Sequence, residues 1–311
     1  MFKYGCYSPW IKGISELPET LTKYASAETA ELILNNSCLR WSSPELFDEP
    51  WAVKHDPKLD FDHITINDAM LKAAVAMIFS RDLPKGNVDH PLFKAIRRWR
   101  SEDRFNDEME AFEALKELLA PTPETLAEKL KKIVTVWKRL IENVRILCLS
   151  ETNKDLLSWS LYADNHRGMA LKFSTEGILA DSKPVEYHSF RSHLTSVKEQ
   201  VDDLVGIKKA DVIDTFDDRL LSRPRSSASE KEWRNVKVFR EDELDCGEDI
   251  EDWHLDLPFE PQELKAVYFG FQMSEQKRAE FIQLLKISYP ATKLFLAFPV
   301  EGQFEVDFKK L

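Results

Sequence analysis

The feature that most constrains the fold is a helical repeat of apolar residues over Pro123–Val144. Thr122 can cap the start of this segment, and proline suits its first turn because the missing N–H has no partner there. The repeat predicts one long amphipathic helix packed against another layer, for which we expect a sheet. Its apolar positions, three or four residues apart, are Leu126, Leu130, Ile133, Val134, Trp137, Leu140 and Ile141.

Strand-like segments lie on both sides of that helix in the sequence. Arg145–Ser150 and Met169–Ser174 flank a short helical segment over Asp155–Ala163. The mixture predicts an α+β fold with a mixed, largely antiparallel sheet. Further strands are predicted at Cys38–Ser42, Trp233–Arg240, Lys265–Phe269 and Lys293–Phe298, and further helices at Ala27–Leu34 and Ser274–Ile287.

We expect one α+β domain over residues 1–311, a length that one large domain can fill. Within it, Leu59–Ala120 is rich in Ala, Met and Leu and predicts several helices rather than strands. Together with the long helix, this segment forms a predicted helical insert or lid over residues 59–144. Arg223–Ser227 combines Arg, Pro and Ser, and it predicts an exposed loop.

Composition narrows the function classes. The formal net charge of −11 disfavours dedicated binding of nucleic acid, although a local basic groove is compatible with it. The longest apolar runs fall short of the ~20 residues that span a bilayer, so no membrane partner is expected. The first residues lack the pattern of a secretion signal, and we therefore expect a cytoplasmic location.

Several familiar chemical motifs are absent from the sequence. The chain holds 9 glycines and has neither GxGxxG nor GxxxxGKS/T, the glycine-rich loops that bind phosphate groups of dinucleotides and nucleotides. It also lacks the GxSxG nucleophile pattern. Its 7 histidines show no zinc-binding spacing, so no metal ligand set is predicted.

Three segments together carry a family resemblance. The most specific is Leu157–Phe173, which follows the pattern W-x-x-Y-A-D-N-H-x-G from Trp159 onward. The others are Lys3-Tyr4 with Leu39–Pro44, and Glu230–Arg234, which follows E-x-E-W-R. In these residues the chain resembles the bacterial domain-of-unknown-function family twenty-nine seventy-one.

The resemblance spans about Lys3 to Phe269 and covers Leu59–Ala120 only weakly. Two departures from the family pattern stand out. Asp48-Glu49 replaces the usual Asn-Asp, which keeps the acidic and polar character, and Ser229 replaces an aromatic residue. The family itself carries no established activity, so the chemistry has to come from the residues and from the order of the segments.

That order is similar to ADP-ribosyltransferase-like folds, which have a basic first strand, a polar strand–helix element and a late strand led by Glu-x-Glu. The similarity implies an NAD-using transferase or glycohydrolase that acts as a bacterial toxin or antiviral defence effector. NAD would be its co-substrate, oriented by the first strand, while the glutamate stabilises an oxocarbenium-like ribose. The implied catalytic residues are Glu232, Glu230, His166 and Tyr162, and the implied cofactor-binding residues are Arg40, Tyr4, Ser42, Trp159 and Asn165.

The chemistry is consistent on its own terms. Cleavage of the nicotinamide–ribose bond builds positive charge on the sugar, and a placed carboxylate stabilises that charge most in the transition state. Residues two apart on a strand face the same side, so Glu230 and Glu232 could line one pocket, where repulsion raises one pKa. We expect Arg40, His166 and Glu232 to line one concave surface. We also expect Glu232→Gln to abolish turnover while NAD binding and folding persist.

Each of these residues also has a structural interpretation. Glu230 and Glu232 could be surface acids paired with Arg234 or Lys231. Arg40 could stack on its neighbouring tryptophan, and His166 could serve only to turn the chain into the following strand. Trp159 and Tyr162, three residues apart on one helical face, are more typical of a core than of substrate stacking.

Two other functions fit the same residues. A metal-dependent nuclease would gather Mg²⁺ with Asp48, Glu49, Glu230 and Glu232, because hard cations prefer oxygen ligands. A non-catalytic sensing or binding module would use the aromatic and polar motif for recognition alone. The sequence names no target for any of the three functions, whether a macromolecule or a small molecule.

Overall fold

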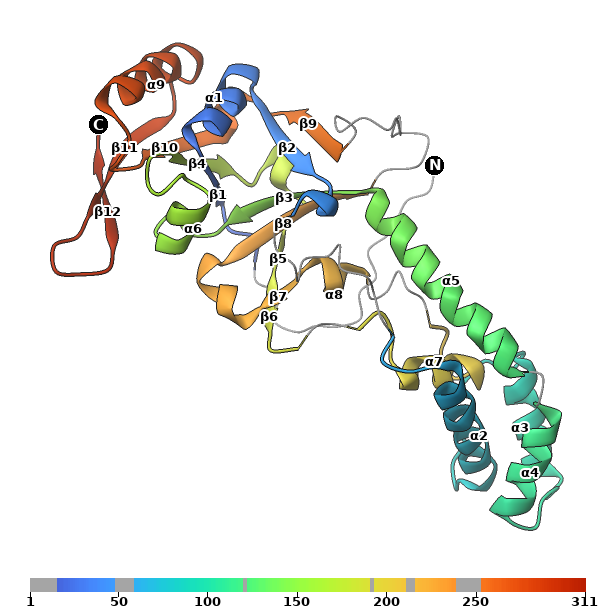
Figure 1. Cartoon of the computed structure of the whole chain (residues 1–311). Helices are drawn as coiled ribbons and strands as arrows, with labels where there is room; N and C mark the ends of the chain where they lie inside the picture. The colour runs from blue at the N-terminus through green and yellow to red at the C-terminus, as the bar shows by residue number, and fades with distance from the viewer. Residues whose placement is uncertain (1–15, 48–58, 120–121, 191–192, 211–215, 239–252) are drawn as a thin grey trace. The chain divides into compact units, whose positions relative to one another are not determined.

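The computed structural model of the protein describes residues 16–47, 59–119, 122–190, 193–210, 216–238 and 253–311 (Figure 1). The chain divides into two compact units. The sheet unit comprises the described residues of Met1–Leu46, Val144–Tyr187 and Arg223–Leu311, and the helical unit comprises those of Phe47–Asn143 and His188–Ser222. The helical unit thus includes a second chain segment beyond the predicted insert of residues 59–144.

The sheet unit is built on one ten-stranded sheet in the order β12-β11-β10-β4-β1-β3-β2-β9, with β8 paired to β3 and β5 paired to β8. Every pairing is antiparallel except that of β10 with β11. The prediction of an α+β fold with a largely antiparallel sheet is therefore confirmed. The strands are β1 Thr20–Ala25, β2 Cys38–Ser42, β3 Val144–Ser150, β4 Met169–Ser174, β5 Lys183–Pro184, β8 Glu232–Val238, β9 His254–Pro258, β10 Leu264–Phe269, β11 Lys293–Pro299 and β12 Val306–Lys310.

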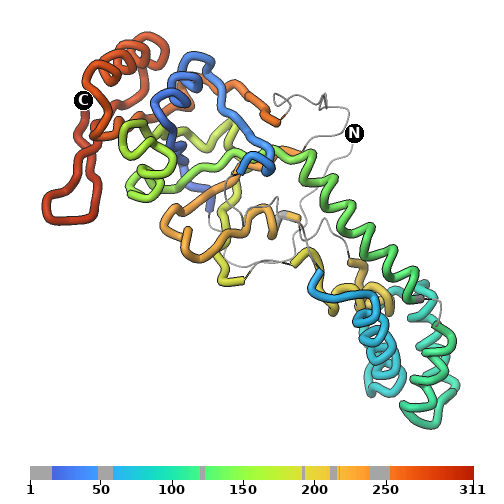
Figure 2. Tube along the Cα trace, viewed as in Figure 1, coloured from blue at the N-terminus to red at the C-terminus, as the bar shows by residue number. Residues whose placement is uncertain are grey.

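One face of this sheet carries the main apolar core. Leu147 and Leu149 of β3 and Trp233 of β8 pack there with helix α1 (Ala27–Asn36) and helix α9 (Glu275–Ser288). The two helices are far apart in sequence but lie side by side (Figure 2), and the Lys277 ammonium is 2.9 Å from the Glu31 carboxylate. Ser26 and Ser274 accept hydrogen bonds from the first turns of these helices, as expected for N-caps.

The opposite face of the sheet is polar at its centre, and we call it the polar face. The register pairs Ser150 with Glu232 and Cys148 with Arg234. Because side chains alternate along a strand, these four residues point away from the core formed by their neighbours in sequence. Helix α6 (Leu156–Leu161), which connects β3 to β4, begins where Asp155 accepts a hydrogen bond from the Ser158 backbone at 2.7 Å.

The helical unit contains α2 (His63–Phe79), α3 (Pro91–Ser101), α4 (Glu108–Leu118), α5 (Thr122–Glu142), α7 (Val197–Leu204) and α8 (Phe216–Leu220). Apolar side chains of α2, α3, α4 and α7 form its core. The predicted long helix is α5, and its buried side includes Trp137, whose ring contacts Phe216 of α8 at a centroid distance of 5.3 Å. Over residues 59–119 the described chain contains helices and no strand.

The prediction of an exposed loop at Arg223–Ser227 is wrong for Arg223. Ser222–Pro224 forms strand β7, which pairs with β6 (Glu186–His188) in a separate two-stranded sheet, and Arg225–Glu230 forms the 3-10 helix η4. Sequence alone indicates a loop because Arg, Pro and Ser are common in loops, whereas the Arg223 side chain is 10% exposed and pairs with Glu230 and Glu232. No helix in the described part of the chain is both long and apolar enough to cross a membrane.

Candidate functional site

The Glu-x-Glu segment lies where η4 meets the polar face. Glu230 is the last residue of η4, and Glu232 is the first residue of β8. Lys231 between them has a φ of 44°, a left-handed conformation that turns the chain from helix into strand. The Ser150 hydroxyl donates to the Glu230 carbonyl oxygen at 2.6 Å and fixes this turn to β3.

Glu232 is held by two arginines inside the protein. Arg234 donates from Nε to Oε1 at 2.7 Å and from Nη2 to Oε2 at 3.3 Å. Arg223 donates from Nη1 to Oε2 at 2.8 Å. Burial alone would raise the pKa of Glu232, but the charges of Arg234 and Arg223 more than offset it, so its pKa lies below its ordinary value. Glu232 is therefore ionised, with both oxygens occupied.

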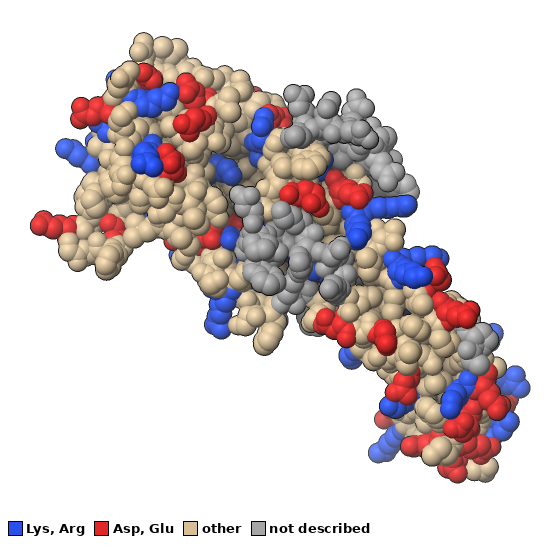
Figure 3. All heavy atoms as spheres, viewed as in Figure 1, with Lys and Arg blue, Asp and Glu red and all other residues tan. Residues whose placement is uncertain are grey.

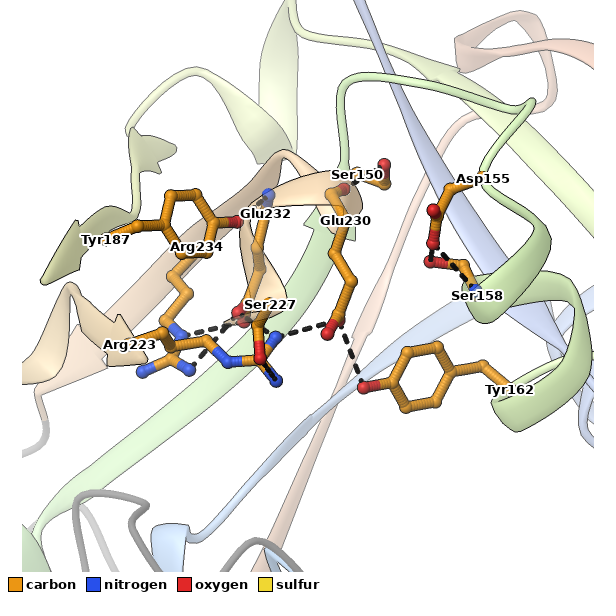
Figure 4. A network of polar contacts seen from close by, with 10 residues as sticks. All are labelled: Ser150, Asp155, Ser158, Tyr162, Tyr187, Arg223, Ser227, Glu230, Glu232 and Arg234. Carbon is orange, nitrogen blue, oxygen red and sulfur yellow. Dashed lines mark hydrogen bonds and ion pairs between the residues drawn. The ribbon is translucent and has the colours of Figure 1, made fainter. Parts of the chain in front are cut away.

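Glu230 shares the same arginine and adds a tyrosine. The Arg223 Nη1 that contacts Glu232 also donates to Glu230 Oε2 at 2.7 Å, and the Tyr162 hydroxyl donates to this oxygen at 3.1 Å (Figure 4). Burial and the nearby negative charge of Glu230 raise the pKa of Tyr162, so its hydroxyl stays protonated. We call Arg223, Glu230, Glu232, Arg234 and Tyr162 the Glu–Arg cluster.

The Glu–Arg cluster is buried except at one edge. The side chains of Arg223, Glu230, Glu232 and Arg234 are 10% exposed or less. Tyr162 remains 45% exposed, so its ring forms the boundary with solvent. Two guanidinium and two carboxylate charges balance each other, which is the condition for burying four charges together.

Two neighbours complete the polar surroundings of Glu232. The Tyr187 hydroxyl, on β6, accepts a hydrogen bond from the Glu232 backbone N–H at 2.7 Å, and burial raises the pKa of Tyr187 to about 12. Burial raises the pKa of the Cys148 thiol to about 12 as well, and this neutral thiol hydrogen-bonds to the Glu232 carboxylate. Both groups are uncharged at neutral pH and leave the charge balance unchanged.

Sequence analysis missed Arg223 and Tyr187. No local pattern marks either residue, because their roles depend on the β6–β7 sheet meeting the start of β8. The one available signal was chemical. An Arg-rich segment, Arg223–Arg225, shortly precedes two glutamates, and opposite charges tend to pair when a turn brings them together.

The turn after α6 packs the His166 ring against other aromatic side chains. The His166 ring stacks on Trp159 at a centroid distance of 5.7 Å and lies 4.6 Å from the Phe271 ring. Burial lowers the pKa of His166. Trp159 is fully buried and donates from its indole nitrogen to the Asn153 carbonyl at 2.9 Å, as a core residue does.

That turn has an unusual backbone. Asp164, Asn165 and His166 have φ values of 45°, 48° and 65°, three consecutive residues in the left-handed region. This conformation costs about 1–2 kcal/mol for an ordinary residue and least for Asp and Asn, which accounts for the Asp-Asn pair. Gly168 then passes so close to β1 that a Cβ there would lie 2.1 Å from the Ala25 carbonyl oxygen. Asn165 thus has a backbone role in this turn.

Arg40 and Ser42 lie on β2, on the polar face but beside β9. Arg40 donates from Nε and Nη2 to the two Asp256 oxygens, each at 2.7 Å, and Ser42 lies 3.4 Å from His254 Nδ1. Within the described residues, neither Arg40 nor His166 hydrogen-bonds to Glu230 or Glu232. The structure thus joins Tyr162 directly to Glu230 and, through Arg223, to Glu232. Tyr4, Asp48 and Glu49 lie outside the described residues.

The Arg40–Asp256 pair gives a prediction about stability. We expect Arg40→Gln to lower the free energy of unfolding by less than about 1 kcal/mol, because the two side chains are 53% and 43% exposed and water solvates both charges. Urea unfolding of the purified parent and variant measures the difference. A loss of several kcal/mol would show that this pair does more for folding than its exposure allows.

Basic and acidic side chains are intermixed on the face of the helical unit seen in Figure 3. Among the described residues, no group of three His, Cys, Asp or Glu side chains is placed to hold a metal ion. Comparisons of the chain with protein-family models, with curated proteins and with solved structures each give no match. The resemblances drawn from the sequence therefore stay predictions.

Proposed function

We propose that the protein is an NAD-using enzyme of the ADP-ribosyltransferase-like type, a transferase or glycohydrolase, with Glu230 as its working carboxylate. One observation supports this. Tyr162 of the central motif and both glutamates of the late Glu-x-Glu motif meet in the Glu–Arg cluster, although about 70 residues separate the two motifs in the sequence. The ADP-ribosyltransferase-like fold, a cytoplasmic location and a role as toxin or antiviral defence effector belong to the same proposal.

Glu230 fits the chemical role better than Glu232. Both oxygens of Glu232 are occupied by guanidinium groups. In contrast, Oε1 of Glu230 makes no hydrogen bond to any described residue, and Tyr162 at its side reaches solvent. We therefore assign Glu232 a positioning role: it fixes Arg223 and, through it, Glu230.

The reaction balances with these groups alone. The bond between ribose C1′ and the nicotinamide nitrogen breaks, and its electron pair leaves with nicotinamide. Negative charge on Glu230 stabilises the positive charge that develops on the ribose. Water or an acceptor nucleophile then adds to C1′, and its proton passes to the Glu230 carboxylate.

A non-catalytic binding module is the second candidate function. The charge balance of the Glu–Arg cluster favours it, because two carboxylates neutralised by two guanidinium groups are also a common structural arrangement. The nuclease alternative has less support. Each glutamate already faces an arginine, whose charge opposes binding of Mg²⁺ at the same oxygens.

The proposal is tested by incubating the purified chain with NAD and measuring free nicotinamide by liquid chromatography. We expect release above that of NAD alone, in proportion to protein concentration. Parallel incubation of DNA and RNA with Mg²⁺ tests for cutting. If neither reaction occurs, the binding module becomes the better explanation.

A further inference from the structure

We propose that Arg223 is a movable anion-binding group. In the ligand-free protein it bridges Glu230 and Glu232, and a phosphate-bearing ligand takes it over and so releases the Glu230 carboxylate. The assignment of NAD as the natural source of that phosphate rests on the proposed function. The exchange of Arg223 between carboxylates and phosphate is independent of the proposed function, because it follows from the contacts of the Glu–Arg cluster.

The two arginines of the cluster make different contacts. Arg234 contacts only Glu232 among the four charged groups of the cluster, through both carboxylate oxygens. Arg223 is shared, since one nitrogen, Nη1, serves Glu230 at 2.7 Å and Glu232 at 2.8 Å. If Arg223 moves away, Glu232 keeps a cation, whereas Glu230 keeps only the neutral Tyr162 hydroxyl. Within the Glu–Arg cluster, moving Arg223 therefore affects Glu230 more than Glu232.

Arg223 also lies on the less firmly held element. Arg234 sits in β8, which is paired with β3 on one side and with β5 on the other. Arg223 sits in β7, whose one partner strand among the described residues is β6. A two-stranded sheet is marginally stable by itself, so β7 can shift at lower cost than β8. Among the contacts drawn in Figure 4, that from Arg223 Nη2 to the Ser227 hydroxyl is the longest of the three that Arg223 makes, at 3.3 Å.

The chain around Arg223 suits phosphate as the incoming anion. A guanidinium group binds phosphate through two parallel hydrogen bonds, and it can exchange one pair of oxygen acceptors for another. Arg225, two residues further on, is exposed and forms no ion pair with any described residue. Ser226 and Ser229 on the same 3-10 helix are exposed as well and offer hydroxyl donors. An anion with two phosphate groups, such as pyrophosphate, could engage both arginines.

Release of Arg223 changes the chemistry of Glu230. Glu232 keeps Arg234 as its cation, whereas Glu230 keeps no cation among the described residues. The Glu230 carboxylate is then open to a group of the bound ligand, and in the absence of ligand Arg223 occupies it.

The test uses inorganic pyrophosphate and the full chain, with binding measured by isothermal titration calorimetry. Arg223→Gln alone leaves a buried negative charge and risks unfolding. The Arg223→Gln/Glu230→Gln double variant removes one charge of each sign and keeps the cluster balanced. We expect this variant to bind pyrophosphate about tenfold more weakly or worse, as loss of a charge-assisted hydrogen bond implies. The Arg98→Gln/Glu102→Gln double variant removes an exposed ion pair of the helical unit; it is the matched control and should bind like the parent.

A second measurement follows the release of Glu230 directly. In protein labelled with ¹³C at the glutamate carboxyl, saturating pyrophosphate should change the chemical shift of the Glu230 signal at constant pH, because its hydrogen bond from Arg223 is lost. The signal is assigned with Glu230→Gln, and a purely structural Arg223 would leave its chemical shift unchanged. Equal pyrophosphate affinity in the parent and the Arg223→Gln/Glu230→Gln variant, or no binding by the parent, would overturn the inference.

Nicotinamide release measured on the same samples separates this inference from the proposed function. Pyrophosphate binding that depends on Arg223, without any nicotinamide release, would uphold the anion exchange and reject the NAD chemistry. Nicotinamide release by a parent protein whose pyrophosphate affinity is independent of Arg223 would uphold the NAD chemistry and reject the anion exchange.

Discussion

Replacement of Glu232 by Gln should lower the free energy of unfolding by about 3–5 kcal/mol, the usual cost of removing one partner from a buried ion pair. Glu232 is 5% exposed and faces Arg234 and Arg223, which would be left as buried cations with too little negative charge. The sequence alone led us to expect a loss of turnover with folding intact. The buried pairing shown by the structure makes a loss of stability the larger effect.

Urea unfolding of the parent and Glu232→Gln measures that loss, and Glu102→Gln is the matched control. Glu102 accepts from Arg98 Nε at 2.8 Å, a contact like that of Glu232 with Arg234, but its side chain is 46% exposed. We expect the control to cost less than about 1 kcal/mol. Similar losses in the two variants would mean that burial of the Glu–Arg cluster has no energetic importance.

The contribution of Glu232 to the free energy of unfolding should also depend on pH. Its folded pKa lies below the ordinary value of 4.5, so its pairing stabilises the folded protein at pH values above 4.5. That stabilisation is lost as the pH falls through the folded pKa, because the carboxylate becomes protonated. The difference in the free energy of unfolding between the parent and Glu232→Gln should therefore become smaller in acid and stay constant from pH 6 to 8. Urea unfolding at each pH measures it.

Replacement of Glu230 by Gln should reduce nicotinamide release by about 10²–10³-fold, the typical effect of removing one preorganised electrostatic group. The substitution keeps the shape of the side chain and can still accept from Tyr162, so NAD affinity should change far less than turnover. Nicotinamide release, NAD affinity and melting temperature are compared for the parent and the variant.

Glu280→Gln serves as the control for this substitution, because Glu280 is 54% exposed on α9 and contacts Gln276 and Lys277 of the same helix. It should keep the activity of the parent. Equal nicotinamide release by the parent and Glu230→Gln would remove Glu230 from the proposed mechanism. An inactive parent would end the NAD-using proposal and leave the binding module.

Much of the fold could be predicted because its signals are local. The long helix follows from apolar spacing between Leu126 and Ile141, and α5 has these residues on its buried side. Ser26 and Ser274 mark helix starts through their own hydroxyl groups. Such patterns depend on a few neighbouring residues, so a single sequence contains them in full.

The site was less predictable because its geometry depends on distant segments. Residues two apart were expected to face the same side of one strand, but Glu230 lies on η4 and Glu232 on β8. They converge because Lys231 adopts a left-handed turn and because Arg223 bridges them. The ion-pair partner of Arg40 could not be predicted from neighbouring residues either, since Asp256 lies 216 residues further along the chain.

The strand pairings have a consequence for how the protein folds. β8 joins β3 only after the chain has closed a loop from Ser150 to Glu232, and β2 joins β9 across a much longer one. Closing long loops costs entropy before any contact repays it, so sheets of this kind form slowly. The charges of the Glu–Arg cluster should therefore meet late, after helices such as α5 have formed. Pulse-labelling hydrogen exchange during refolding would show this order, with protection of the α5 amides preceding that of the β8 amides.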